Sequence, residues 1–191
     1  MEYTSIQEPA FNAKPKKFIV WLFVVSSTIM FGGWTSYYIV FSASKGKGHG
    51  LVLPDLFIYS TLVLVLSSIT LFLAGRALKQ GRVTRQRTLL WTTLLLGGLF
   101  GYLQFDAWTV LYKTGAFLIN NNAAISMIYI VSGFYLLHIF AGICILINSL
   151  VGTYRKLPVE RAVYRQDIAA IFWHFIDILW IYLYVFLLLN S

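Results

Sequence analysis

Residues 18–41 read FIVWLFVVSSTIMFGGWTSYYIVF, an apolar run of 24 residues without a charged side chain. A helix needs about 20 consecutive apolar residues to cross the hydrocarbon core of a bilayer. The run is also longer than the apolar core of a secretory signal peptide, and no small-residue cleavage site accompanies it. The sequence therefore predicts a retained membrane-spanning helix at this position.

Four further apolar runs follow, each bounded by charged or strongly polar residues: 56–75, 88–105, 125–151 and 168–189. Their lengths match a bilayer and exceed those of ordinary core helices. Backbone groups in lipid must be hydrogen-bonded within the segment, which favours helices over isolated strands. We therefore expect an all-α, polytopic membrane protein in which residues 1–191 form one domain, a bundle of five transmembrane helices.

The composition excludes two other classes of protein. Hydrophobic residues make up 59% of the chain and charged residues only 12%, with a mean hydropathy of +0.74. Soluble domains average about 45–50% apolar and about 25% charged residues, and disordered chains are less apolar still. A net charge of +8 would suggest a nucleic-acid partner on a soluble protein, but here the position of the charges gives a different explanation.

Twelve of the fifteen basic residues fall on one side of the predicted spans. They occupy the segment before the first span and the connections between the second and third and between the fourth and fifth spans: Lys14, Lys16, Lys17, Arg76, Lys79, Arg82, Arg85, Arg87, Arg155, Lys156, Arg161 and Arg165. Basic residues concentrate on the cytoplasmic side of membrane proteins. We therefore predict a cytoplasmic N-terminus, an external C-terminus and no nucleic-acid partner.

Ionisable residues inside the predicted spans are rare. They are His138 in the fourth span and His174 and Asp177 in the fifth, where Trp173 and Trp180 lie nearby. His174 and Asp177 are three residues apart, so they share a helix face and can pair. Such groups are costly in a membrane and suggest function by default. Three interpretations remain open: a polar clamp between helices, a proton relay, and a ligand site such as that of a small transporter.

A second reading of the two intramembrane histidines is a b-type cytochrome, with His138 and His174 as axial haem ligands. His138 lies 13 residues from the cytoplasmic end of its span and His174 lies 6 residues from the start of its own. At ~1.5 Å per residue their depths differ by roughly 10 Å, which disfavours a shared haem. The single cysteine, Cys144, offers no thiolate cluster. We therefore expect an accessory subunit that binds no metal and has no chemistry of its own.

Two motifs resemble subunit III of the haem–copper oxidases. Residues 172–180, FWHFIDILW, are similar to the Tyr/Phe-Trp-His-Phe-Val-Asp-x-x-Trp signature of that family. Residues 133–142, GFYLLHIFAG, are similar to its Gly-Phe-His-x-x-His-Val-x-x-Gly stretch. The resemblance extends over nearly the whole chain, at the length of bacterial members with five helices.

Two positions depart from the family pattern. The first helix of the family often carries a buried glutamate after a serine, whereas this chain has Ser27 after Ser26. The first histidine of the fourth-helix pair is replaced by Tyr135. A role assigned to the family glutamate is therefore not transferred to this chain.

The resemblance implies a non-catalytic subunit that packs against the catalytic subunit I and other subunits of a respiratory cytochrome c oxidase, or of a quinol oxidase. Haem and copper would belong to the partner subunits, and the chain would bind phospholipid and support proton uptake in a bacterial inner (cytoplasmic) membrane. His138, Trp173, His174, Asp177 and Trp180 would form a buried polar clamp that shapes a lipid cleft.

Overall fold

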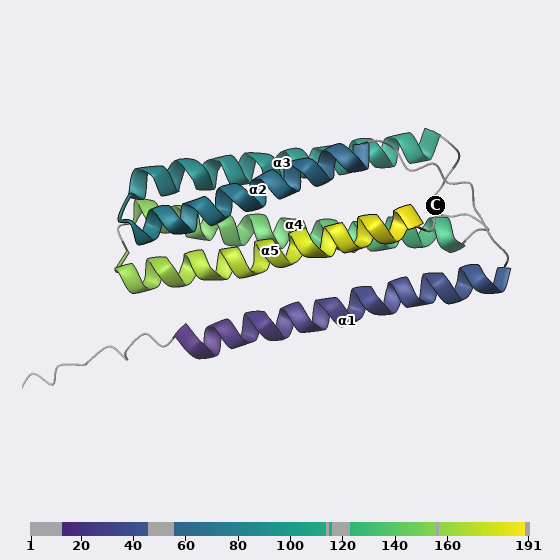
Figure 1. Cartoon of the computed structure of the whole chain (residues 1–191), viewed down its shortest axis with the longest axis horizontal. Coiled ribbons are helices and arrows are strands. Elements are labelled where there is room, and N and C mark those ends of the chain that lie inside the picture. Colours follow the sequence, from purple (N-terminus) through teal and green to yellow (C-terminus); the bar gives the residue numbers. More distant parts are fainter. Residues whose placement is uncertain (1–12, 46–55, 114, 116–122, 156, 190–191) are drawn as a thin grey trace, which may run out of the picture.

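The computed structural model describes residues 13–45, 56–113, 115, 123–155 and 157–189. These residues form five long helices (Figure 1): α1 (Ala13–Lys45), α2 (Leu56–Lys79), α3 (Val83–Lys113), α4 (Ala123–Tyr154) and α5 (Val159–Leu189). All five are long and apolar enough to cross a membrane. The predicted all-α membrane architecture is therefore confirmed.

The helices extend beyond the apolar runs that predicted them. α5 begins at Val159, nine residues before the predicted span, and α3 begins at Val83, five residues before its span. The added turns contain arginines and glutamines, which favour helix as well as leucine does. Hydrophobicity marks where a helix enters lipid, whereas the helix itself continues until a turn residue such as Gly81 (φ 71°) ends the run.

α2, α3, α4 and α5 form a four-helix bundle with α1 along one side (Figure 1). α2 packs against α3 and α5, and α4 packs against the same two helices. α1 contacts only α4 and α5 among the described helices. The chain therefore divides into a bundle that is packed on several faces and one peripheral helix.

Aromatic side chains fill the centre of the bundle. The largest fully buried aromatic side chains of α2 to α5 are Trp173, Trp180, Tyr135, Phe57 and Phe100, and α1 adds Phe31. Trp180 lies with its ring centroid 4.9 Å from that of Tyr135 and 5.1 Å from that of Phe100. Aromatic pairs at such distances add stabilisation beyond the area they bury, so the α5 tryptophans are the centre of the core.

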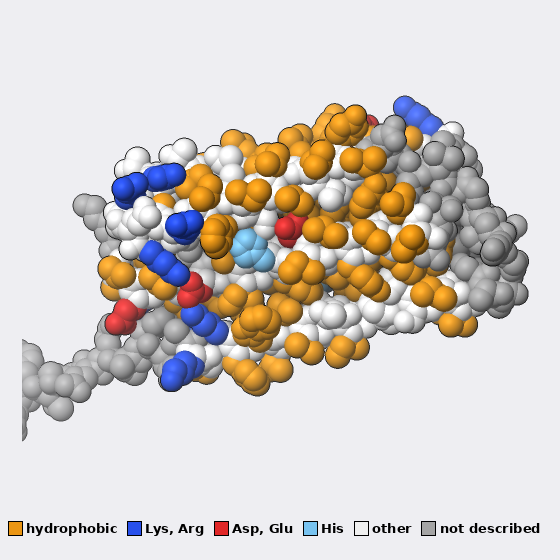
Figure 2. Space-filling view, viewed as in Figure 1, with side chains coloured by type: hydrophobic (Ala, Val, Ile, Leu, Met, Phe, Trp, Pro, Cys, Tyr) orange, Lys and Arg blue, Asp and Glu red, His pale blue; other side chains and the backbone are white. Residues whose placement is uncertain are grey.

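Charged side chains lie apart from the hydrophobic ones. Figure 2 shows lysine and arginine gathered at the end where α2 joins α3 and α4 joins α5, and hydrophobic side chains along the middle. An apolar exterior of this length suits contact with acyl chains. The assignment of the basic end to the cytoplasm stays a prediction of the positive-inside rule.

Candidate functional site

The two tryptophans of α5 are hydrogen-bonded to α2. Trp173 Nε1 donates to Ser67 Oγ (2.9 Å), and Trp180 Nε1 donates to Thr61 Oγ1 (2.9 Å). Both indoles are almost fully buried, and buried tryptophans usually find a partner for the N–H group. The same side chains therefore supply apolar volume and fix the register of α5 against α2.

The hydroxyl groups on α2 act in two directions. Ser67 Oγ donates to Leu64 O (2.6 Å), and Thr61 Oγ1 donates to Phe57 O (2.7 Å). Each hydroxyl therefore donates its only proton within α2, and its lone pairs accept the N–H group of an indole from α5. This arrangement satisfies the donors of both helices without a free hydroxyl proton at the contact.

His174 and Asp177 meet at Ser68, the next residue of α2. Ser68 Oγ and His174 Nδ1 are joined by a hydrogen bond of 2.5 Å, and Ser68 also interacts with the Asp177 carboxyl group. His174 and Asp177 interact electrostatically. Asp177 is only 9% exposed, and within the described part of the chain its Oδ1 atom has no hydrogen-bond partner.

This polar pair lies on an outer face of the bundle. Figure 2 shows a histidine and an acidic side chain next to each other, midway along the hydrophobic face over α2 and α5. His174 is partly exposed, whereas Trp173 is almost completely buried. The α5 residues 173–177 therefore span from the core to the surface of the bundle.

The Trp173 ring lies between two glycines from other helices. A Cβ atom on Gly97 of α3 would be 2.7 Å from Trp173 Cη2, and one on Gly142 of α4 would be 3.0 Å from Trp173 Cε3. Both distances are shorter than ordinary van der Waals contact. Small residues allow helices to approach closely in membranes, and here they make room for an indole ring rather than for a backbone.

In the Gly97-x-x-x-Gly101 pattern, only Gly97 lies close to a side chain of another helix. A Cβ atom on Gly101 would have no neighbour within 4 Å in the structure. Gln104, one turn further along α3, is fully buried, and its Nε2 atom donates to Ser60 Oγ of α2 (3.3 Å). The pattern therefore does not form a glycine-to-glycine helix contact.

His138 has partners on different helices from those of His174. His138 Nδ1 donates to Phe134 O within α4 (2.8 Å), and His138 Nε2 is 3.1 Å from Ser27 Oγ of α1. Since a carbonyl can only accept, Nδ1 is the donor to Phe134 O, and Ser27 Oγ is the partner of Nε2. Ser27 therefore joins α1 to α4 through His138.

Of the five residues singled out from the sequence, four are brought together on α5 and one stands apart. Trp173, His174 and Trp180 each bond to a hydroxyl of α2, and Asp177 joins them at Ser68. His138 packs instead against α1, with its ring 5.3 Å from Phe31. These five residues thus take part in two separate groups of polar contacts, one from α5 to α2 and one from α4 to α1.

Sequence reasoning missed the residues on the other side of these contacts. These residues form two pairs on α2, Ser60 with Ser67 and Thr61 with Ser68. The members of each pair are seven residues apart, which places them on one face of α2. This spacing is visible in the sequence and could have predicted a polar face on α2. Tyr135 was noticed only as a departure from the family pattern, and its hydroxyl donates to Ile176 O of α5 (3.2 Å). Within the described ranges, no three His, Cys, Asp or Glu side chains are grouped to hold a metal ion.

Comparison with known proteins identifies the family. The family model described as cytochrome c oxidase subunit III matches residues 9–191. The chain belongs to this family. It is therefore subunit III of a haem–copper oxidase and a multi-pass membrane protein.

Several curated relatives carry the name cytochrome c oxidase subunit 3. The protein of Thermostichus vulcanus is 28% identical over 174 residues, which are 87% of this chain and 83% of the relative. That of Alkalihalophilus pseudofirmus is 28% identical over 171 residues, which are 86% of this chain and 81% of the relative. That of Latimeria chalumnae is 30% identical, but the match covers only 65% of its length and 86% of this chain.

Proposed function

We propose that this subunit III stabilises the catalytic subunit I of a respiratory oxidase and supports proton uptake, with no redox step on its own residues. The observation that supports this proposal is the engagement of the polar groups of α5. Trp173, His174 and Trp180 all bond to hydroxyls of α2. These side chains hold the helices in register, which is the requirement for a rigid surface offered to a partner subunit.

Haem and copper belong to the partner subunits in this proposal. The contacts of the two intramembrane histidines support it. His138 is bonded through both ring nitrogens, and His174 is bonded to Ser68 through Nδ1. An imidazole must present a free nitrogen to bind a metal, so His138 would have to give up a contact between helices first.

A groove between α2 and α5 supports the proposed binding of phospholipid. Its volume is about 140 Å³, with apolar walls that include Leu71 and Phe72. Arg76 and Lys79 line its charged part together with Asp167, whose carboxylate is paired with Lys17, and the Nε2 atom of Gln166 is buried without a hydrogen-bond partner among the described residues. Cations and an unused donor suit a phosphate group, because phosphate oxygens only accept.

We place the protein in the bacterial inner (cytoplasmic) membrane, with its basic end toward the cytoplasm. Two observations support this location. The five helices suit a multi-pass protein, and the relative from Alkalihalophilus pseudofirmus comes from a bacterium. The basic connections between α2 and α3 and between α4 and α5 suit the cytoplasmic side.

Purification of the native complex through an affinity tag on this chain tests the proposal. We expect the chain to co-purify with a subunit that carries haem and copper, and the complex to reduce oxygen with cytochrome c as electron donor. Oxidation of quinol instead would identify the quinol-oxidase alternative. A Soret band that stays with this chain after the subunits are separated would contradict the proposal and support a b-type cytochrome.

A variant of Asp177 separates assembly from proton uptake. In the Asp177→Ala variant His174 loses its charged neighbour on the bundle face, so we expect the yield of assembled complex to fall more than the turnover of the complex that does assemble. Normal assembly with slow proton uptake would instead assign the pair to a proton relay.

A further inference from the structure

An apolar cavity lies at the basic end of the bundle, between the α2–α3 turn and the α4–α5 connection. Its volume is about 420 Å³, within the range of pockets that bind small ligands or single anchoring side chains. Leu78, Val83, Leu157 and Val159 provide apolar walls, and the buried side chains of Gln86 and Ser149 form its polar part.

The mouth of this cavity is apolar although it lies among charged residues. Val159 is 75% exposed and Val83 is 43% exposed. Val159 begins α5 nine residues before the apolar run, which places it roughly 13 Å beyond the start of that run. Exposed aliphatic side chains are expected where a helix faces acyl chains, but in a layer of charged residues they indicate a surface that a partner covers.

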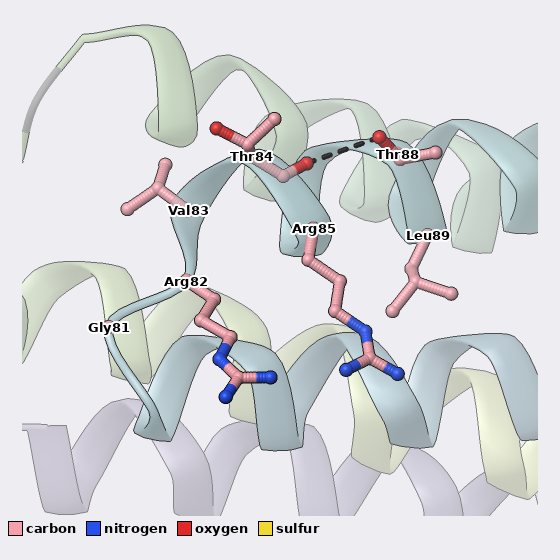
Figure 3. A pocket seen from close by; sticks show the side chains of 7 residues that line it. All are labelled: Gly81, Arg82, Val83, Thr84, Arg85, Thr88 and Leu89. Carbon is pink, nitrogen blue, oxygen red and sulfur yellow. Dashed lines mark hydrogen bonds between the residues drawn. The ribbon is translucent and has the colours of Figure 1, made fainter.

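The charges around the cavity are almost all positive. Lys79 lines the cavity itself, and Arg82 and Arg85 line an adjoining hollow that shares Gly81 and Val83 with it. Figure 3 shows the Arg82 and Arg85 side chains extending in the same direction from the start of α3, with Thr84 and Thr88 pointing away. Within the described part of the chain, neither arginine forms an ion pair.

We propose that this cavity binds an acidic segment of a neighbouring protein, with one large apolar side chain inserted between Val83 and Val159. Complementary charge favours that occupant, because Lys79, Arg82 and Arg85 would meet its carboxylates. A buried apolar anchor surrounded by a polar rim is the usual form of a protein contact with a dominant anchoring residue. The site is separate from the α2–α5 contact and goes beyond the proposed function.

Photo-cross-linking in the assembled complex tests this proposal. Benzoylphenylalanine is placed at Val159, which is exposed enough to accept it, and the cross-linked peptides are identified by mass spectrometry. We expect one dominant peptide from another protein chain, with Asp or Glu close to the attached apolar residue. The same reagent at Glu160, which does not line the cavity, is the matched control and should give at least fivefold less of that product.

Charge variants test the complementarity. The double variant Lys79→Glu, Arg82→Glu should lower the cross-link yield at Val159 at least fivefold, whereas Glu160→Gln should leave it unchanged or raise it. If the double variant fails to assemble, raising the ionic strength of the unaltered complex gives the same information, because exposed charge contacts weaken with salt. Cross-links only to lipid, only to residues 1–12 of this chain (which carry Glu2 and Glu8), or to nothing would overturn the proposal.

Discussion

α5 and α1 are both apolar helices of about the same length, but they are attached to the protein in different ways. α5 places two tryptophans in the core and contacts α1, α2 and α4. α1 contacts only α4 and α5, and many of its large side chains face outward, including Ile19, Ile29 and Val40. Hydropathy alone does not distinguish the two helices.

The difference lies in what each contact is made of. α5 is held by ring packing and hydrogen bonds together, since Trp173 both fits between glycines and donates to Ser67. α1 is also held by ring packing, since its Phe31 is fully buried against His138, but its polar contacts are single and distributed along its length: Lys17 to Asp167, Ser27 to His138 and Thr35 to Tyr182. We infer that α5 is held more firmly than α1, because α1 contacts only two helices and has a single fully buried large side chain, Phe31.

The largest effect is expected from Gly97→Ala. The added methyl group would clash with the rigid Trp173 ring, and overpacking of this kind costs about 1–3 kcal/mol. The measurement is the free energy of unfolding of the subunit in mixed detergent and SDS. Gly98→Ala is the matched control, because a Cβ atom there has no neighbour within 4 Å. Equal stability of the two variants would contradict the packing of Trp173 against α3.

A smaller effect is expected from Ser68→Ala. This variant removes the hydrogen bond to His174, and bonds between membrane helices contribute at most about 1.7 kcal/mol. The same unfolding measurement applies. Thr92→Ala is the control, since the Thr92 hydroxyl donates to Thr88 O within its own helix. A loss in Ser68→Ala no larger than the loss in the control would contradict a stabilising hydrogen bond between Ser68 and His174.

Ser27→Ala tests the attachment of α1. The variant removes the hydroxyl that bonds to His138 Nε2, and we expect a loss of about 0.6 kcal/mol, the average for such contacts. Ser26→Ala is the matched control, because Ser26 is exposed. Disulfide trapping between α1 and α4 should become slower in S27A alone. If S27A destabilised the subunit as much as the Gly97 variant, the division between core and peripheral helix would be wrong.

The smallest effect is expected at the ion pair of Lys17 and Asp167. The Nζ–Oδ2 distance is 2.5 Å, but each side chain is about one-third exposed. Exposed ion pairs contribute about 0.2–1 kcal/mol and weaken with salt. A double-mutant cycle with Lys17→Met and Asp167→Asn should give a coupling energy in that range at low salt and close to zero at high salt. A coupling energy that persists at high salt would indicate a contact shielded from solvent.

The five helices could be predicted because membrane spans have a strong sequence signal. Each apolar run, from 18–41 to 168–189, lies within one helix of the structure. The family was also recognisable from FWHFIDILW. This motif places several different polar and aromatic residues at fixed spacing inside a membrane span, and the need for an apolar span does not explain such a combination. The helix ends were less predictable, because charged residues such as Arg161 and Arg165 continue a helix outside lipid.

The partners of the polar residues were harder to predict. A serine or threonine within a span can bond to its own backbone, as Thr92 does, or also accept from a neighbouring helix, as Ser67 does. Spacing alone does not separate the two cases. The arrangement of helices decided that His138 meets Ser27 on α1 rather than the polar residues of α5, and no local pattern contains that information.

The position of Trp173 has a consequence for biosynthesis. The ring that fills the space between Gly97 and Gly142 belongs to the helix that follows both of them in the chain. During synthesis α2, α3 and α4 leave the ribosome first. Until α5 enters the bilayer, the space beside Gly97 and Gly142 has no indole ring to fill it. Until α5 packs into the bundle, α3 and α4 therefore either admit lipid into that space or pack differently from the finished structure.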